Sequence, residues 1–145
     1  MSTRYSVPLI ITITAWCLVS GCSDETLRPP KTVPVSGSVT YQGKPTRGVR
    51  VKFHPQFDIG DVPFTPYGET GADGKFLLNT GASGNGAPKG DYIVTMEMPY
   101  IDADPKDGLE AELDYLRGAY SDPAKSNLKV TIKDGNNVLE PFQLN

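Results

Sequence analysis

Apolar and polar residues alternate along most of the chain that follows Val33. A period of two residues is typical of β-strands that bury one face and expose the other. The alternation predicts seven strands, at residues 33–42, 49–54, 65–70, 76–78, 92–98, 128–133 and 138–144. Turn residues lie between most of these strands, as at 42–45, 71–74 and 134–137. Short strands at this spacing favour an all-β sandwich or barrel.

The apolar positions of these strands should form the core of a single domain. The expected core residues are Val51, Phe53, Tyr92, Val94, Val130 and Ile132. In the last expected strand, Glu140 interrupts an otherwise apolar stripe that begins at Val138. The register of that strand is therefore less well defined by the pattern than the others.

One segment follows a different period. Asp107 resembles a helix N-cap, and Glu110 stands at the position of a capping box. Leucines follow at helical spacing: Leu109, Leu113 and Leu116. Gly118 is suited to end a helix in a left-handed conformation. We expect one short helix here, inside a long connection.

The first 21 residues have the parts of a secretory signal peptide. A single charge, Arg4, precedes a mostly apolar run from Val7 to Val19, which is too short to span about 30 Å of hydrocarbon. The run ends in Val19-Ser20-Gly21-Cys22, which resembles the lipobox of bacterial lipoproteins. The alternatives are an uncleaved membrane anchor and a buried first strand.

A lipobox implies cleavage between Gly21 and Cys22 and attachment of fatty acyl chains, such as palmitate, to Cys22. Each buried methylene contributes about 0.8 kcal/mol, so two or three chains anchor more firmly than one. Residues 22–32 would form a lipidated tether and residues 33–145 the domain. Ser23 stands where an inner-membrane retention rule of some bacteria has Asp, so the outer membrane is favoured if one is present.

Charge and composition exclude several classes of function. Loss of Arg4 with the signal peptide leaves 13 basic and 17 acidic residues, a net charge of −4. The basic residues form no cluster, so nucleic acid is not an expected partner. Cys17 leaves with the signal peptide and Cys22 is lipidated, so the mature domain has no thiol for a disulfide.

Few residues are candidates for catalysis or for a metal. His54 is the single histidine, and no partner nucleophile or ligand set accompanies it, so we expect it on the surface. Three acids, Asp102, Asp104 and Asp107, are weak calcium candidates, but their spacing departs from an EF-hand loop. We expect no catalytic residue, no metal and no cofactor.

The long connection at residues 99–120 is the expected interaction surface. It contains three tyrosines, Tyr100, Tyr115 and Tyr120, together with the densest acidic run of the chain. Long structured insertions on a rigid scaffold often carry function. The alternative is that these tyrosines only pack the expected helix onto the sandwich.

Several segments, in their order, resemble carboxypeptidase-regulatory-like domains of small bacterial lipoproteins. They are VSGSVTYQGKP (35–45), GVRVKF (48–53), TGADGKF (70–76), GDYIVT (90–95), YSDP (120–123) and LKVTIKDGNN (128–137). The resemblance covers about residues 33–145. It implies a transthyretin-like, seven-stranded Greek-key sandwich, usually a non-catalytic accessory module. An enzyme of that fold, hydroxyisourate hydrolase, has several active-site histidines that this chain lacks.

These observations lead to one functional expectation and its alternatives. We expect a lipoprotein of the bacterial cell envelope, bound to the lipid bilayer through acylated Cys22. Its domain would be a non-catalytic interaction or structural module for an envelope protein or polysaccharide. The alternatives are a dedicated polysaccharide-binding module and an enzyme with an unrecognised site.

Replacing Cys22 with Ala should abolish lipid attachment, because the cysteine sulfur is the site of acylation. In the native host the variant should remain an unprocessed precursor that carries no acyl chains. Fractionation and the mass of the N-terminal peptide measure both effects. A variant that is still processed and still extracted with membranes would contradict the lipobox interpretation.

Overall fold

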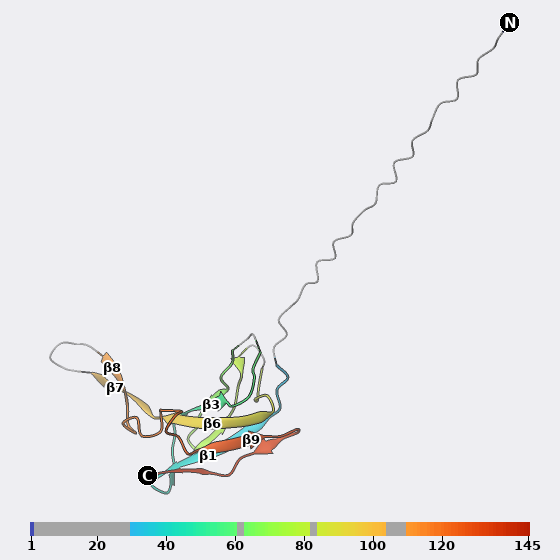
Figure 1. The fold of residues 1–145 in the computed structure, drawn as a ribbon. Helices are drawn as coiled ribbons and strands as arrows, with labels where there is room; N and C mark the ends of the chain where they lie inside the picture. The colour runs from blue at the N-terminus through green and yellow to red at the C-terminus, as the bar shows by residue number, and fades with distance from the viewer. Residues whose placement is uncertain (2–29, 61–62, 82–83, 104–109) are drawn as a thin grey trace.

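The computed structural model describes residue 1 and residues 30–60, 63–81, 84–103 and 110–145 (Figure 1). Over these residues the fold is all-β and sandwich-like, with nearly no helix. The strands are β1 (Val35–Tyr41), β2 (Lys44–Pro45), β3 (Arg50–Pro55), β4 (Tyr67–Glu69), β5 (Lys75–Leu77), β6 (Gly90–Glu97), β7 (Pro99–Ala103), β8 (Glu110–Asp114), β9 (Lys129–Ile132), β10 (Asn137–Val138) and β11 (Phe142–Leu144). The described residues contain no helix long and apolar enough to cross a membrane.

Two sheets form the body of the domain, and a third pair of strands extends from it (Figure 1). The first sheet has five strands, ordered β10-β1-β11 with β2 and β5 also paired to β1. The second sheet has four strands in the order β4-β3-β6-β9. Strands β7 and β8 pair only with each other within the described part of the chain.

Strand β1 is the centre of the first sheet. It pairs in parallel with β10, where Val35 lies opposite Asn137, and with β11, where Val39 lies opposite Phe142. It pairs antiparallel with β2 and β5. Parallel partners cannot be joined by a tight hairpin. Here almost the whole domain forms the connection between them.

The core lies between the two sheets and is rich in aromatic rings. Phe53 of β3 packs 5.9 Å from Tyr92 of β6 and 6.5 Å from Phe76 of β5, measured between ring centroids. The Phe76 ring fills the space beside Gly37, where a Cβ would lie 2.5 Å from it. The buried hydroxyl of Tyr92 donates a hydrogen bond of 2.7 Å to the carbonyl of Pro88, and burial raises its pKa.

The core expected from the alternation is confirmed at most positions. The buried members are Val51, Phe53, Tyr92, Val94 and Ile132. Val130 lies on β9, opposite Tyr92. It is only partly buried, because β9 is the outermost strand of its sheet.

The count of seven strands is wrong, mainly at the end of the chain. The last expected strand is two short strands, β10 and β11, separated by residues 139–141. Pro141 has no N–H to donate to a ladder, so it is disfavoured within a continuous paired strand. Glu140 lies in this break, and Val138 before it is 75% exposed rather than buried. Strands β2, β7 and β8 were not expected.

The expected helix is wrong over the residues that the structure describes. Residues 110–114 form strand β8, and turns follow it. Leu113 lies opposite Tyr100 of β7 and is exposed, whereas Leu116 in the following turn is buried. Pairing with a second strand therefore overrides the local helical spacing. Asp107 and Leu109 lie outside the described residues.

Truncating Phe53 to Ala should lower the free energy of unfolding by about 3–5 kcal/mol, because the ring is fully buried. Urea unfolding followed by circular dichroism measures the change. Leu77→Ala, at a side chain 74% exposed on β5, is the control and should change stability by less than about 0.5 kcal/mol. Similar losses in both variants would contradict the placement of the core.

Candidate functional site

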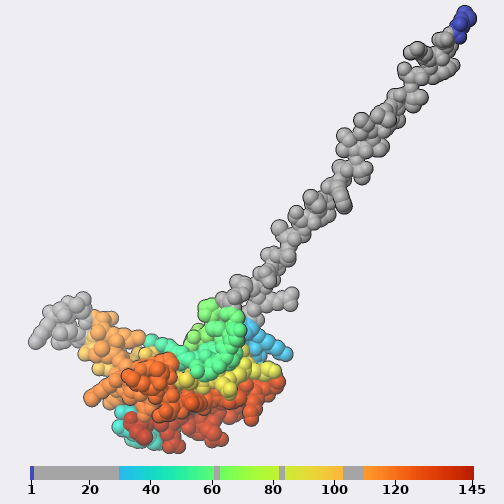
Figure 2. All heavy atoms as spheres, viewed as in Figure 1, coloured from blue at the N-terminus to red at the C-terminus, as the bar shows by residue number. Residues whose placement is uncertain are grey.

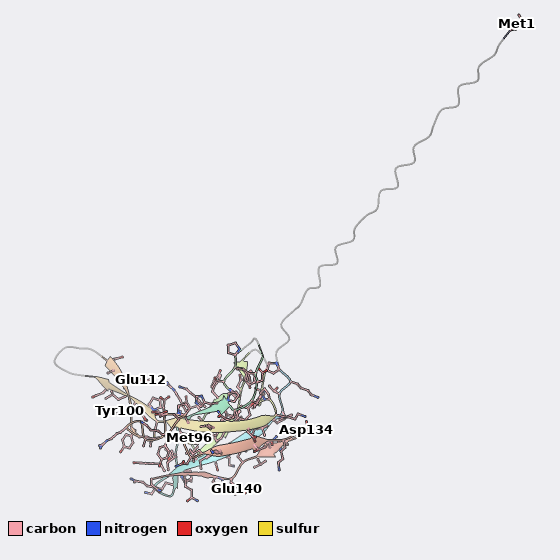
Figure 3. All side chains as sticks on the ribbon, viewed as in Figure 1. Met1, Met96, Tyr100, Glu112, Asp134 and Glu140 are labelled. Atoms are coloured by element: carbon pink, nitrogen blue, oxygen red, sulfur yellow. The ribbon has the colours of Figure 1, made fainter. Side chains whose placement is uncertain are left out.

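The ribbon of β7 and β8 projects from one end of the sandwich (Figures 1 and 2). Strand β6 ends at Glu97, and after Met98 the chain continues directly into β7 at Pro99. Figure 3 shows Tyr100 and Glu112 on this ribbon, away from Asp134 at the other end of the body. An isolated two-stranded ribbon is marginally stable in water, so its attachment to the body is important.

The ribbon carries exposed apolar side chains near its attachment. Tyr100 and Leu113 lie directly opposite each other, so their side chains share one face. Tyr115, in the turn after β8, lies beside them, because its ring contacts that of Tyr100. Ile101 is exposed on the other face. This concentration of large apolar groups on a projecting element is the main surface feature of the site.

Asp114 fixes the base of the ribbon. One carboxylate oxygen accepts hydrogen bonds from the backbone N–H groups of Met98 (2.8 Å) and Leu116 (3.0 Å). The other oxygen accepts from the N–H of Gly118 at 2.8 Å. The buried side chain of Leu116 packs into the core beside this turn. A single side chain of β8 therefore joins the residue that precedes β7 to the turn that follows β8.

A charged pair connects the ribbon to β3. The Arg50 guanidinium donates two hydrogen bonds to the Glu112 carboxylate, at 2.7 and 3.1 Å. These bonds lower the pKa of Glu112 and raise that of Arg50. Both side chains are about half exposed, so the pair defines the position of the ribbon more than it stabilises the fold.

Three tyrosines meet where the ribbon joins the body. The Tyr115 ring lies 6.1 Å from Tyr41 and 6.2 Å from Tyr100, nearly perpendicular to each. They line a concavity of about 740 Å³, which we call the tyrosine groove. Its lining residues are Tyr41, Tyr100, Asp114, Tyr115, Leu116, Arg117 and Asn145.

The structure brings together two of the three tyrosines expected at the interaction surface. Tyr100 and Tyr115 are in contact and exposed. Tyr120 is partly buried and lies outside the lining of the groove. Its carbonyl accepts from the N–H of Met96, and its hydroxyl accepts from the N–H of Asn145 at 3.2 Å. Tyr120 therefore supports the groove from behind.

The sequence did not indicate four further residues of the groove: Tyr41, Asp114, Arg117 and Asn145. Tyr41 lies within the first expected strand, at residues 33–42, and was not part of the expected interaction surface. It reaches the groove because β1 pairs with β11, where Tyr41 lies opposite Leu144. Arg117 has a positive φ of 54°, which is uncommon outside glycine. No local pattern in the sequence signals that conformation.

The remaining candidate residues are not gathered into a site. Asp102 is exposed on β7, whereas Asp104 and Asp107 lie outside the described residues, as do Gly21 and Cys22. Within the described ranges, no group of three or more His, Cys, Asp or Glu side chains is placed to hold a metal ion.

His54 lies half-buried on the outer side of the four-stranded sheet. Its Nε2 is 2.8 Å from the hydroxyl of Thr95. Burial lowers the pKa of His54, and the nearby Lys52 charge lowers it further. The ring therefore favours its neutral form, and its described hydrogen bond is to a hydroxyl of the same sheet.

A second exposed apolar patch lies on the five-stranded sheet. Leu77 of β5 and Val138 of β10 lie on either side of Ser36 of β1, in one row across the sheet. Their side chains are 74% and 75% exposed. Because it lies on a different sheet from the ribbon, this patch offers matched control positions.

No protein-family model matches this sequence, and no curated protein matches it. Similar solved structures include a 9R-lipoxygenase from Cyanothece (11% identity, TM-score 0.42), the major pilin subunit of Bacillus cereus (14%, 0.42) and a candidate carbohydrate-binding protein from Pseudomonas aeruginosa (11%, 0.43). In the same order, the matches cover 79%, 78% and 80% of this chain. They cover 16%, 29% and 90% of the matched chains. Likeness at this level concerns the β-sandwich fold alone.

Asp114→Asn should loosen the base of the ribbon. The amide oxygen of Asn can still accept from Met98 and Leu116, but its NH₂ group would face the N–H of Gly118. An unsatisfied donor costs about 1–3 kcal/mol when it is buried, and less where water reaches it. Amide hydrogen exchange at residues 98 and 115–118 should become faster. Asp102→Asn, on the exposed part of the same ribbon, is the control and should leave this exchange unchanged; equal effects would contradict the role of Asp114.

Proposed function

We propose that this chain is a lipoprotein of the bacterial cell envelope, anchored through acylated Cys22, whose domain is a non-catalytic binding module. The signal-peptide pattern and the Val19–Cys22 lipobox support the anchor. The order of motifs between residues 35 and 137 supports a transthyretin-like sandwich of the carboxypeptidase-regulatory-like type. The sandwich-like, all-β fold is consistent with that assignment.

One observation carries the binding proposal: exposed apolar side chains are concentrated on a projecting ribbon that the body holds in place. Exposed apolar groups that cluster beside a groove are typical of interaction sites. Asp114, Leu116 and the Arg50–Glu112 pair restrain the ribbon before any partner binds. Binding to a restrained surface loses less conformational entropy than binding to a mobile one.

The partner is an envelope component, either a protein or a polysaccharide. A tether of the length of residues 22–32 would let the domain reach material close to the membrane. Polysaccharide binding is the second candidate function. The tyrosine groove supports it, because the groove combines aromatic rings with polar side chains in a concave site. An enzyme with an unrecognised site remains the alternative class.

The double substitution Tyr100→Ala and Leu113→Ala should remove the partner while keeping the fold. Both side chains are exposed, so the loss of stability should be small. Crosslinking in intact cells, followed by isolation of the protein, measures the captured material as peptides and as sugars. We expect at least a tenfold decrease in the component that is enriched with the unmodified protein.

The matched control is the double substitution Leu77→Ala and Val138→Ala, which removes a similar apolar area from the five-stranded sheet. It should retain the partner. Retention of the partner by both variants, with unchanged circular dichroism, would contradict the ribbon as the binding surface. Loss of the partner by the control variant alone would assign the interaction to the five-stranded sheet.

A further inference from the structure

We infer that the tyrosine groove binds the pyranose rings of an uncharged glycan chain. This inference deepens the proposed function and rests on it. It assigns a ligand to the concave part of the surface, formed by Tyr41, Tyr100, Tyr115, Arg117 and Asn145.

The dimensions of the groove suit a short stretch of sugar better than a protein surface. Its volume of about 740 Å³ lies inside the range of roughly 300–1,000 Å³ typical of small-ligand sites. A stable protein interface needs about 800 Å² from each partner. The groove has seven lining residues, fewer than the roughly 20–30 residues that each partner contributes to such an interface.

The aromatic lining matches the two kinds of surface of a pyranose. A sugar ring has apolar C–H groups on its faces and hydroxyls around its edge. The three large rings of the groove are all tyrosines, which combine an apolar face with a hydroxyl that can donate and accept. Tyr115 remains 58% exposed although two rings contact it. Those perpendicular contacts fix its orientation, so little order has to be gained when a sugar binds.

Two polar side chains complete the groove. Arg117 and Asn145 lie on its lining and offer N–H donors, and Asn145 also offers an amide oxygen. Among the described residues Arg117 forms no ion pair. Its left-handed conformation is unfavourable for a non-glycine residue, and strained residues of this kind are concentrated at functional sites. Asp114 also lines the groove, but we assign it no contact with the sugar. Both of its carboxylate oxygens already accept backbone hydrogen bonds.

Charge favours an uncharged glycan over an acidic one. The ribbon beside the groove exposes the carboxylates of Asp102 and Glu110, and the chain is acidic as a whole. An anionic polymer that extended along this ribbon would be repelled. A neutral or N-acetylated chain has no such penalty.

The direct test titrates the full-length protein in detergent micelles with hexa-N-acetylchitohexaose, with cellohexaose and with polygalacturonate. Isothermal titration calorimetry should show binding of at least one of the two neutral hexasaccharides, and weaker binding of the polyuronate. Tyr115→Ala should weaken this binding at least tenfold. Tyr67→Ala, at a tyrosine 53% exposed on β4, is the matched control and should leave the affinity unchanged.

Two further variants separate recognition from folding. Tyr115→Phe keeps the aromatic face and should retain most of the affinity that Tyr115→Ala loses. Arg117→Gly suits the positive φ, so it should preserve or improve stability while it weakens glycan binding severalfold. If Arg117→Gly binds sugar as well as the unmodified protein does, the assignment of Arg117 is wrong.

The outcomes distinguish this inference from the function on which it rests. Absence of binding to both neutral hexasaccharides overturns the inference, as does a preference for polygalacturonate or an equal effect of Tyr115→Ala and Tyr67→Ala. If the ribbon still captures a protein in cells, the proposed function survives and only the glycan assignment fails. If neither sugar nor protein depends on the ribbon, both fail.

Discussion

The parallel pairing of β1 with β10 and β11 is the constraint on which the rest of the structure depends. It joins residues separated by about 100 positions, as in the hydrogen bond from the Thr40 hydroxyl to the Phe142 carbonyl. It also makes β1 a shared centre, since β2 and β5 pair with the same strand. The Phe76 ring can then lie over Gly37 and face Phe53 of the opposite sheet. The parallel partner also contributes to the core, since Phe142 of β11 stacks on Phe76 with ring centroids 6.3 Å apart.

The same pairing assembles the candidate site. Tyr41 ends β1, and Asn145 follows β11, so both reach the groove because these strands are neighbours. The other residues come from the ribbon and from the turn that Asp114 organises. The groove thus combines one rigid wall, provided by the sheet, with a second wall whose position depends on a few polar contacts. A change in Asp114 would alter the second wall and leave the first in place.

The sequence predicted those features that depend on local periodicity. Alternation located the strands around Phe53 and Tyr92 because one face of each is buried, and the Asp73-Gly74 turn was recognised from its residues. Prediction from the sequence failed where the pairing of distant segments determines the structure. Leu113 has the spacing of a helical residue, yet the pairing of β8 with β7 places it opposite Tyr100. The sequence singled out Tyr100 and Tyr115, which the structure places in contact. It did not single out Tyr41, because no local pattern records that the first and last strands are neighbours.

The late position of β10 and β11 in the chain also affects how the protein is made. The first sheet cannot close until residues 137–144 have been synthesised, and contacts between such distant segments form slowly. An envelope protein of the kind proposed crosses the inner membrane as an unfolded chain. In a chain exported as proposed, this topology would delay folding in the cytoplasm, so the arrangement that builds the groove would also keep the precursor competent for export.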